Sequence, residues 1–182
     1  MIAENELSIR FSKMRTRVKD LNKMENYIYK FTESLGQRYL LQSDYYDCPH
    51  GVIKIQKYFD DINYTKILFY DKNVQKVNND FIQVKMSTND NSEEISMILS
   101  VALHKKASVK IVRRQFRKDN YLINLDQVED FGHFMTLKYI FDDDTIPEEN
   151  IMFKLKKIMF IEFDINIKDI LPTESYAELF FT

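Results

Sequence analysis

Short segments in which polar and apolar side chains alternate recur along this chain of 182 residues, and they constrain its fold more than any other feature. A period of two residues is typical of a β-strand, because successive side chains point to opposite faces of a sheet. The alternation, and the turn residues between segments, predict strands over residues 6–11, 38–47, 52–59, 64–71, 81–88, 109–116, 121–128 and 134–141. Strands therefore dominate the predicted structure.

At four places along the chain, the apolar residues are spaced as in a helix instead of alternating with polar ones. In the first of them, apolar residues recur every three or four positions from Leu21 through Met24 and Ile28, and Gly36 is typical of the residue that follows a helix. The predicted helices cover residues 20–35, 92–104, 151–163 and 174–181. This order of elements predicts a single α+β domain over residues 1–182, an antiparallel β-barrel with helices packed outside.

The strands also have polar faces, which two arrangements explain. Glu6, Ser8 and Arg10 share one face of the first predicted strand, opposite its apolar residues. A barrel with a polar lumen accounts for such a face, and so does an open sheet with one side in solvent. The alternation alone leaves both arrangements open.

Composition excludes several classes of protein. The net charge is -2, so no overall attraction for nucleic acid is expected, and duplex nucleic acid is not an expected partner. No apolar run approaches the roughly 18 residues that span a bilayer, and residues 1–6 do not resemble a secretory signal, so no membrane is expected. The only cysteine, Cys48, fits a reducing compartment, and we expect a cytoplasmic location.

Five segments carry a resemblance to a known family, in the family's order. They are Glu6-Leu7-Ser8-Ile9-Arg10, Gln42-Ser43-Asp44-Tyr45-Tyr46-Asp47-Cys48-Pro49, Gly51-Val52-Ile53-Lys54-Ile55-Gln56, residues 125–138 and Ser175-Tyr176-Ala177-Glu178-Leu179-Phe180. The chain resembles the CYTH proteins of the triphosphate tunnel superfamily, and its last segment is similar to the ending of class IV adenylate cyclases. The resemblance implies an antiparallel barrel in which lumen Lys and Arg hold a triphosphate and lumen Glu and Asp hold one or two divalent cations.

The chain departs from the family's pattern at five positions that the resemblance places in the lumen: Ser8, Arg10, Gln56, Thr136 and Lys138. Arg10 keeps a positive charge, whereas Ser8, Thr136 and Lys138 each replace an acid. Glu6 and Asp126 remain as candidate catalytic residues and as ligands of a single Mg²⁺ or Mn²⁺, with no other cofactor expected. Lys138 would repel that metal, or bind an anion directly in its place.

The ligand-binding candidates on the same resemblance are Arg10, Lys54, Arg113, Arg114, Lys138, Ser8, Gln56 and Thr136. Arg113 aligns best with a phosphate-binding arginine, and a slip of one residue would put Arg114 there instead. A surface patch around residues 110–118 is an alternative for both arginines, and a strand-face ion pair is an alternative for Glu6 and Arg10. Asp126 has a hydrogen-bonding role in the following turn as its alternative.

Three functions follow as hypotheses. The first is a pseudoenzyme, a CYTH protein with weak or no catalysis that binds a phosphorylated small molecule or nucleotide in a basic lumen. The second is an active Mg²⁺- or Mn²⁺-dependent triphosphatase or adenylate cyclase that uses Glu6 and Asp126. The third is a protein-interaction module on the same scaffold, and a homodimer is compatible with each of the three.

Overall fold

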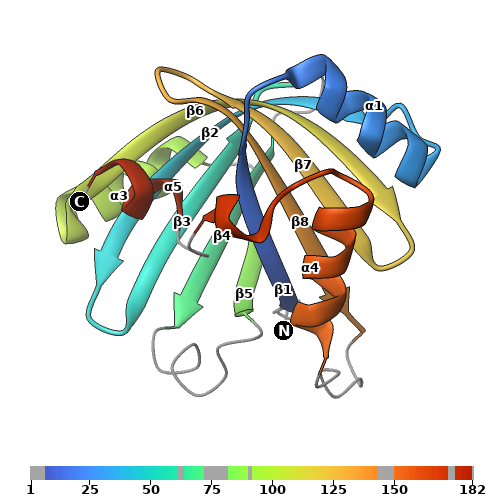
Figure 1. Ribbon diagram of the computed structural model, residues 1–182. Coiled ribbons are helices and arrows are strands. Elements are labelled where there is room, and N and C mark those ends of the chain that lie inside the picture. Colours follow the sequence, from blue (N-terminus) through green and yellow to red (C-terminus); the bar gives the residue numbers. More distant parts are fainter. Residues whose placement is uncertain are drawn as a thin grey trace. The chain divides into compact units, whose positions relative to one another are not determined.

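A computed structural model of the chain describes residues 7–60, 64–71, 82–89, 92–142, 150–171 and 175–181 (Figure 1). The strands of the described residues are β1 (Leu7–Val18), β2 (Gln37–Cys48), β3 (Gly51–Tyr58), β4 (Tyr64–Asp71), β5 (Ile82–Asn89), β6 (Lys105–Lys118), β7 (Tyr121–Val128), β8 (Gly132–Phe141) and β9 (Ile170–Leu171). The helices are α1 (Leu21–Thr32), α3 (Ser92–Leu103), α4 (Ile151–Ile161) and α5 (Tyr176–Phe180), with a 3₁₀ turn at Ile167–Asp169.

The strands pair in the order β5-β4-β3-β2-β6-β7-β8-β1-β9, and β5 has an additional pairing with β1. Strands that follow one another through short turns, such as β2 with β3 and β6 with β7, pair in antiparallel fashion. These pairings confirm the predicted α+β class with antiparallel strands and added helices. No helix in the described part of the chain is long and apolar enough to cross a membrane.

The described residues group into two compact units. The first unit takes its residues from Met1–Arg10, Leu40–Lys110 and Glu174–Thr182, and the second from Phe11–Tyr39 and Ile111–Thr173. Strands β1, β2 and β6 each contribute residues to both. The single domain over residues 1–182 stays a prediction.

In the first unit, β3 runs between β2 and β4, and its register sets which side chains share a face. Tyr45 and Ser43 of β2 lie opposite Lys54 and Gln56 of β3, so these four side chains belong to one face. Tyr46 belongs to the other face, where its hydroxyl donates to the carbonyl of Ser96 in α3 at 3.3 Å. Helix α3 therefore covers the face opposite Lys54 and Gln56.

The last helix of this unit begins as its sequence predicts. Ser175 is the N-cap of α5, and its hydroxyl accepts from the amide of Glu178, whose carboxylate accepts from the amide of Ser175 in return. This reciprocal arrangement satisfies two donors that a helix N-terminus would leave without partners.

In the second unit, α1 and α4 pack on one face of β6, β7, β8 and β1. The buried core contains Met24 and Ile28 from α1, Leu155 and Met159 from α4, and strand residues that point toward them, among them Met14, Phe116, Ile123, Leu125, Met135 and Leu137. All of these side chains are at most 5% exposed. The opposite face of the same strands carries polar residues, among them Arg113, Asp126 and Thr136.

Two boundaries differ from their predictions for physical reasons. Helix α1 ends at Thr32 rather than at residue 35, because Glu33 adopts a left-handed conformation and donates its amide to the carbonyl of Tyr29. Strand β1 continues to Val18, seven residues beyond its predicted end, because alternation resumes after Ser12-Lys13 with the apolar residues, Met14 and Val18, moved to the other face.

Gly36 follows this helix end in a backbone conformation in which an alanine would be strained. Its φ is +70°, and a Cβ atom would lie 2.7 Å from a ring carbon of Phe116 and 2.9 Å from the carbonyl oxygen of Gln115. We expect Gly36→Ala to lower the free energy of unfolding by roughly 2–4 kcal/mol in chemical denaturation, through backbone strain and overpacking together.

Gly132→Ala is the matched control for this substitution. Gly132 also has a positive φ, +94°, but nothing lies within 4 Å of its Cβ position, so only strain of about 1–2 kcal/mol is expected. Equal losses for the two variants would show that the contact with Phe116 costs nothing.

Candidate functional site

The polar face of the second unit is defined by strand register. Arg113 of β6 lies opposite Asp126 of β7, which lies opposite Phe134 of β8. Residues that lie directly opposite each other across a strand pair share a face, so all three point away from the core beneath α1 and α4. Two residues further along, Gln115, Asn124 and Thr136 occupy the same face in the same order.

Strand β1 adds two arginines to this face. The Nε of Arg15 donates to the Oγ1 of Thr136 at 3.1 Å, and the guanidinium of Arg17 lies 4.8 Å from the centre of the Phe134 ring. The ammonium of Lys138 lies 4.7 Å from the centre of the Phe11 ring on the same side. We call the surface made by Arg15, Arg17, Arg113, Asp126, Thr136 and Lys138 the basic face.

A buried ion pair lies within the basic face. The Nε and Nη2 of Arg113 each donate to one carboxylate oxygen of Asp126 at 2.7 Å, in a two-pronged arrangement. Asp126 is 0% exposed and Arg113 is 7% exposed. Hydrogen bonds between ionised groups at such short distances are the strong ones in proteins, and here they compensate for the removal of both charges from water. Asp126 therefore holds the guanidinium of Arg113 in one orientation.

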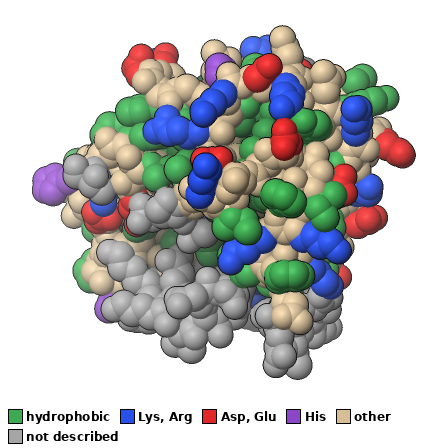
Figure 2. All heavy atoms as spheres, viewed as in Figure 1, with side chains coloured by type: hydrophobic (Ala, Val, Ile, Leu, Met, Phe, Trp, Pro, Cys, Tyr) green, Lys and Arg blue, Asp and Glu red, His purple; other side chains and the backbone are tan. Residues whose placement is uncertain are grey.

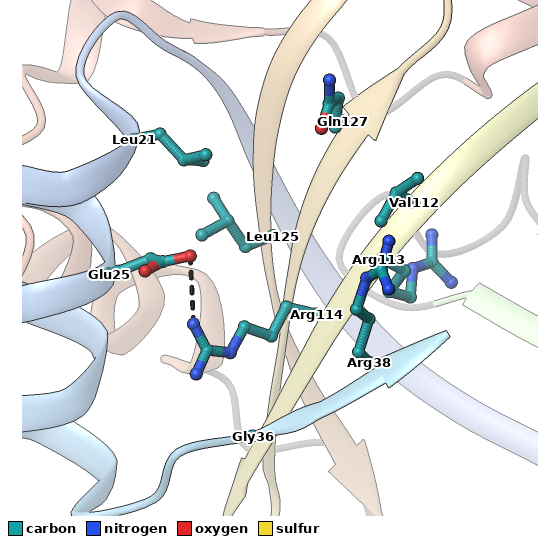
Figure 3. Close-up of a pocket in the computed structure, with 9 residues that line it drawn as sticks. All are labelled: Leu21, Glu25, Gly36, Arg38, Val112, Arg113, Arg114, Leu125 and Gln127. Carbon is teal, nitrogen blue, oxygen red and sulfur yellow. Dashed lines mark ion pairs between the residues drawn. The ribbon is translucent and has the colours of Figure 1, made fainter. Parts of the chain in front are cut away.

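The structure distinguishes between the two neighbouring arginines. Arg113 belongs to the basic face, whereas Arg114 points to the opposite face of β6, where it pairs with Glu25 of α1 at 3.1 Å and donates to the carbonyl of Leu35 at 2.7 Å. Arg114 and Glu25 line a pocket of about 380 Å³ that Arg38 and Arg113 also line, and Figure 3 shows Arg38 next to Arg113. The two arginines therefore make different contacts, and the predicted ligand-binding role of Arg114 stays a prediction.

The basic face also differs from the outer surface. The alternative of a surface patch around residues 110–118 does not describe Arg113, since that residue is buried. On the surface seen in Figure 2, Lys and Arg side chains are interspersed with Asp, Glu and hydrophobic ones. The basic face instead has four cationic side chains and a single carboxylate, which already has a partner.

The remaining predicted site residues belong to the first unit, and the structure leaves the whole of Glu6 and the side chain of Ser8 undescribed. Lys54 and Gln56 lie in the first unit, where the ammonium of Lys54 is 5.5 Å from the centre of the Tyr45 ring and Gln56 donates to Ser43 at 3.3 Å. Arg10 is a half-buried residue of β1 in the same unit. Ser8 lies in β1, but its side chain, like the whole of Glu6, lies outside the described residues.

The described side chains of the basic face do not fit a divalent cation. Mg²⁺ and Mn²⁺ prefer several oxygen ligands, and carboxylates above all. Asp126 is the one acid here, and both of its oxygens accept from Arg113. In the described part of the chain, no group of three or more His, Cys, Asp and Glu side chains is placed to hold a metal ion. The pair of Glu6 and Asp126 as metal ligands stays a prediction.

Sequence reasoning missed Arg15 and Arg17, because the first strand was predicted to stop at residue 11. A signal was present, since Lys13, Arg15 and Arg17 occupy alternate positions, although the apolar positions shift by one residue after Phe11. An extended strand would have placed all three basic residues on one face.

A second buried acid, Asp44, lies in the first unit. Its carboxylate accepts from Ser108 at 2.7 Å, from Gln42 at 2.9 Å and from Lys105 at 3.2 Å, and the ammonium of Lys57 is 3.7 Å away. Burial by itself would raise the pKa of Asp44, but the hydrogen bonds from Ser108 and Gln42 and the charge of Lys105 together hold the pKa below its ordinary value. This acid joins β2 to β3 and β6.

Comparisons with known proteins show the fold. No family model and no curated protein matches the sequence. Among solved structures, a conserved hypothetical protein from Pyrococcus furiosus is 16% identical, with a TM-score of 0.73 over 93% of this chain and 99% of that one. A candidate adenylate cyclase from Vibrio parahaemolyticus is also 16% identical, with a TM-score of 0.71 over 93% of this chain and 96% of that one.

A third neighbour is a candidate adenylyl cyclase from Hippeastrum with a dominant triphosphatase activity. It is 11% identical and has a TM-score of 0.61, over 94% of each chain. At these identities the likeness concerns the fold alone. The chain has the CYTH, or triphosphate tunnel, fold of adenylate cyclase-like and triphosphatase proteins, as its sequence motifs predict.

The buried pair of Arg113 and Asp126 should be costly to break. Asp126→Ala would leave the guanidinium of Arg113 buried without its carboxylate, and we expect a loss of about 3–5 kcal/mol in the free energy of unfolding. Chemical denaturation measures this loss. Lys23→Ala, which removes the exposed ion pair with Asp164, is the control and should change stability little. A small effect of Asp126→Ala would contradict the account of the pair.

Asp44 should make stability depend on pH in the acid range. Because its pKa is lower in the folded chain than in the unfolded one, its stabilising contribution is complete above the unfolded value of about 3.8 and is lost as the pH falls through the lower folded value. Asp44→Asn should flatten the decrease in melting temperature below about pH 4. An unchanged pH profile would contradict this assignment.

Proposed function

We propose that this protein binds a polyanionic phosphorylated ligand, a nucleotide or triphosphate, on its basic face, with weak or no catalysis. The observation that carries the proposal is the imbalance of charge on this face. Arg15, Arg17, Arg113 and Lys138 are cationic, and Asp126, the one carboxylate among the described residues there, is paired with Arg113.

The chemistry of these side chains suits phosphate. A guanidinium presents several N–H donors in a planar fork that matches phosphate oxygens, and an ammonium adds a compact charge. Arg15 and Arg113 are each 7% exposed, so little water competes with an anion that reaches them. Thr136 and Asp126 orient the two guanidinium groups by accepting their hydrogen bonds.

Weak catalysis is proposed because the described face lacks a carboxylate for chemistry. Cyclisation of a nucleotide needs a base for the ribose hydroxyl, and hydrolysis needs a positioned water. Asp126 is the nearest candidate for either role, but both of its oxygens accept from Arg113 at 2.7 Å. The alternative of an active triphosphatase is supported by the activity of the neighbour from Hippeastrum and by the shared fold.

Titration calorimetry with inorganic triphosphate and with ATP tests the proposal. Lys138→Ala should weaken binding about tenfold, which corresponds to about 1.4 kcal/mol and to the loss of one charged contact. Lys156→Ala, on the exposed side of α4, removes the same charge away from the basic face and should leave the affinity unchanged.

Absence of binding to all phosphorylated ligands would contradict the proposal and favour a protein-interaction module. The same samples should be assayed for release of phosphate and pyrophosphate with Mg²⁺ and with Mn²⁺. Steady turnover would support the enzyme alternative instead.

A further inference from the structure

The oxygen atoms at the centre of the basic face already accept hydrogen bonds from the protein. Asp126 accepts from Arg113 at 2.7 Å through both oxygens, and the hydroxyl of Thr136 accepts from Arg15 at 3.1 Å. The side-chain oxygen of Asn124, which lies opposite Thr136 in the register, accepts from Gln115 at 2.8 Å. A metal ion would have to displace these donors to gain its ligands.

Charge opposes a metal ion at the same place. Two of these three oxygen-bearing side chains are held by guanidinium groups, so a divalent cation bound to either would lie within a few ångströms of a positive charge. Arg15 and Arg113 are almost completely buried, and water would therefore screen this repulsion poorly. Lys138 adds a further cation to the same face from β8.

We infer that the basic face takes its oligophosphate ligand without a divalent cation. This inference rests on the function proposed above and narrows its ligand class to polyphosphates that are free of metal. The guanidinium groups of Arg15 and Arg113 and the ammonium of Lys138 supply the positive charge that a bridging metal would otherwise supply. Mg²⁺ then acts as a competitor, because it binds the phosphate oxygens of the ligand and lowers the ligand's charge.

Calorimetry with inorganic triphosphate in two buffers tests this inference. One buffer contains EDTA, the other contains Mg²⁺ in excess over the ligand, and both have the same ionic strength. We expect binding in EDTA and an affinity about tenfold weaker in Mg²⁺, equivalent to the loss of one charged contact. An equal affinity in the two buffers would support a site that needs no metal but would contradict competition by Mg²⁺.

The outcomes separate the inference from the function on which it rests. Binding that requires Mg²⁺, or that tightens when Mg²⁺ is added, would overturn the metal-free site and leave the proposed function standing. Absence of binding in both buffers would overturn the proposed function, and the inference with it. The comparison uses the natural chain, so it does not depend on the folding of a variant.

Lys138→Glu provides a second readout, because it replaces a cation of the basic face by a carboxylate. This variant should lose binding in EDTA and regain part of it in Mg²⁺. Its affinity for triphosphate should therefore be higher in Mg²⁺ than in EDTA, the reverse of the natural chain. Lys156→Glu makes the same change of charge on the exposed side of α4 and should still bind triphosphate more tightly in EDTA than in Mg²⁺. If both variants bound triphosphate more tightly in EDTA than in Mg²⁺, the role assigned to Lys138 would be contradicted.

Discussion

The ion pair between Arg113 and Asp126 is the interaction on which the candidate site depends. It joins β6 to β7 through two short hydrogen bonds and removes both charges from water. Without Asp126, burial of the Arg113 guanidinium would be strongly unfavourable, and without Arg113 the carboxylate would be equally hard to bury. The pair also leaves the face positively charged, because the carboxylate of Asp126 is paired with Arg113 and the surrounding side chains are cationic.

The two faces of the second unit differ: one forms the core, and the other carries the candidate site. One face is apolar and packs beneath α1 and α4, with Ile123, Leu125 and Met135 among its buried side chains. The other carries its cations on long side chains that lie against aromatic rings, as Arg17 does on Phe134 and Lys138 on Phe11. A cation is attracted to the face of a ring, so these contacts help to hold the two cations on this face.

Much of the fold could be predicted from the sequence because period-two alternation is a local property. The segments 64–71 and 121–128 were predicted with the bounds that β4 and β7 have. Apart from the first strand, which was predicted to end seven residues too early, the remaining predicted strands lie within observed ones or differ by one residue at their ends. The short strand β9 was missed, because two residues are too few to show an alternating pattern. The last helix was predicted over residues 174–181, and α5, with its capping box of Ser175 and Glu178, lies within that range.

The site was less predictable, because it depends on register and burial rather than on periodicity. The choice between Arg113 and Arg114 required the pairing of β6 with β7, which places one on each face. Asp126 was recognised from its motif, but its two-pronged contact with Arg113 could not be inferred from residue types. Asp44 belongs to one of the segments that resemble the family, yet nothing local indicates that Ser108 and Lys105, more than sixty positions away, hold its carboxylate.

The most direct test of a metal-free basic face is a crystal structure determined with inorganic triphosphate and Mn²⁺ together, with anomalous scattering used to locate manganese. The account predicts phosphate oxygens within hydrogen-bonding distance of Arg15, Arg113 and Lys138, and no manganese bound to Asp126. Manganese bridging Asp126 and the triphosphate, with Arg113 displaced from the carboxylate, would contradict it.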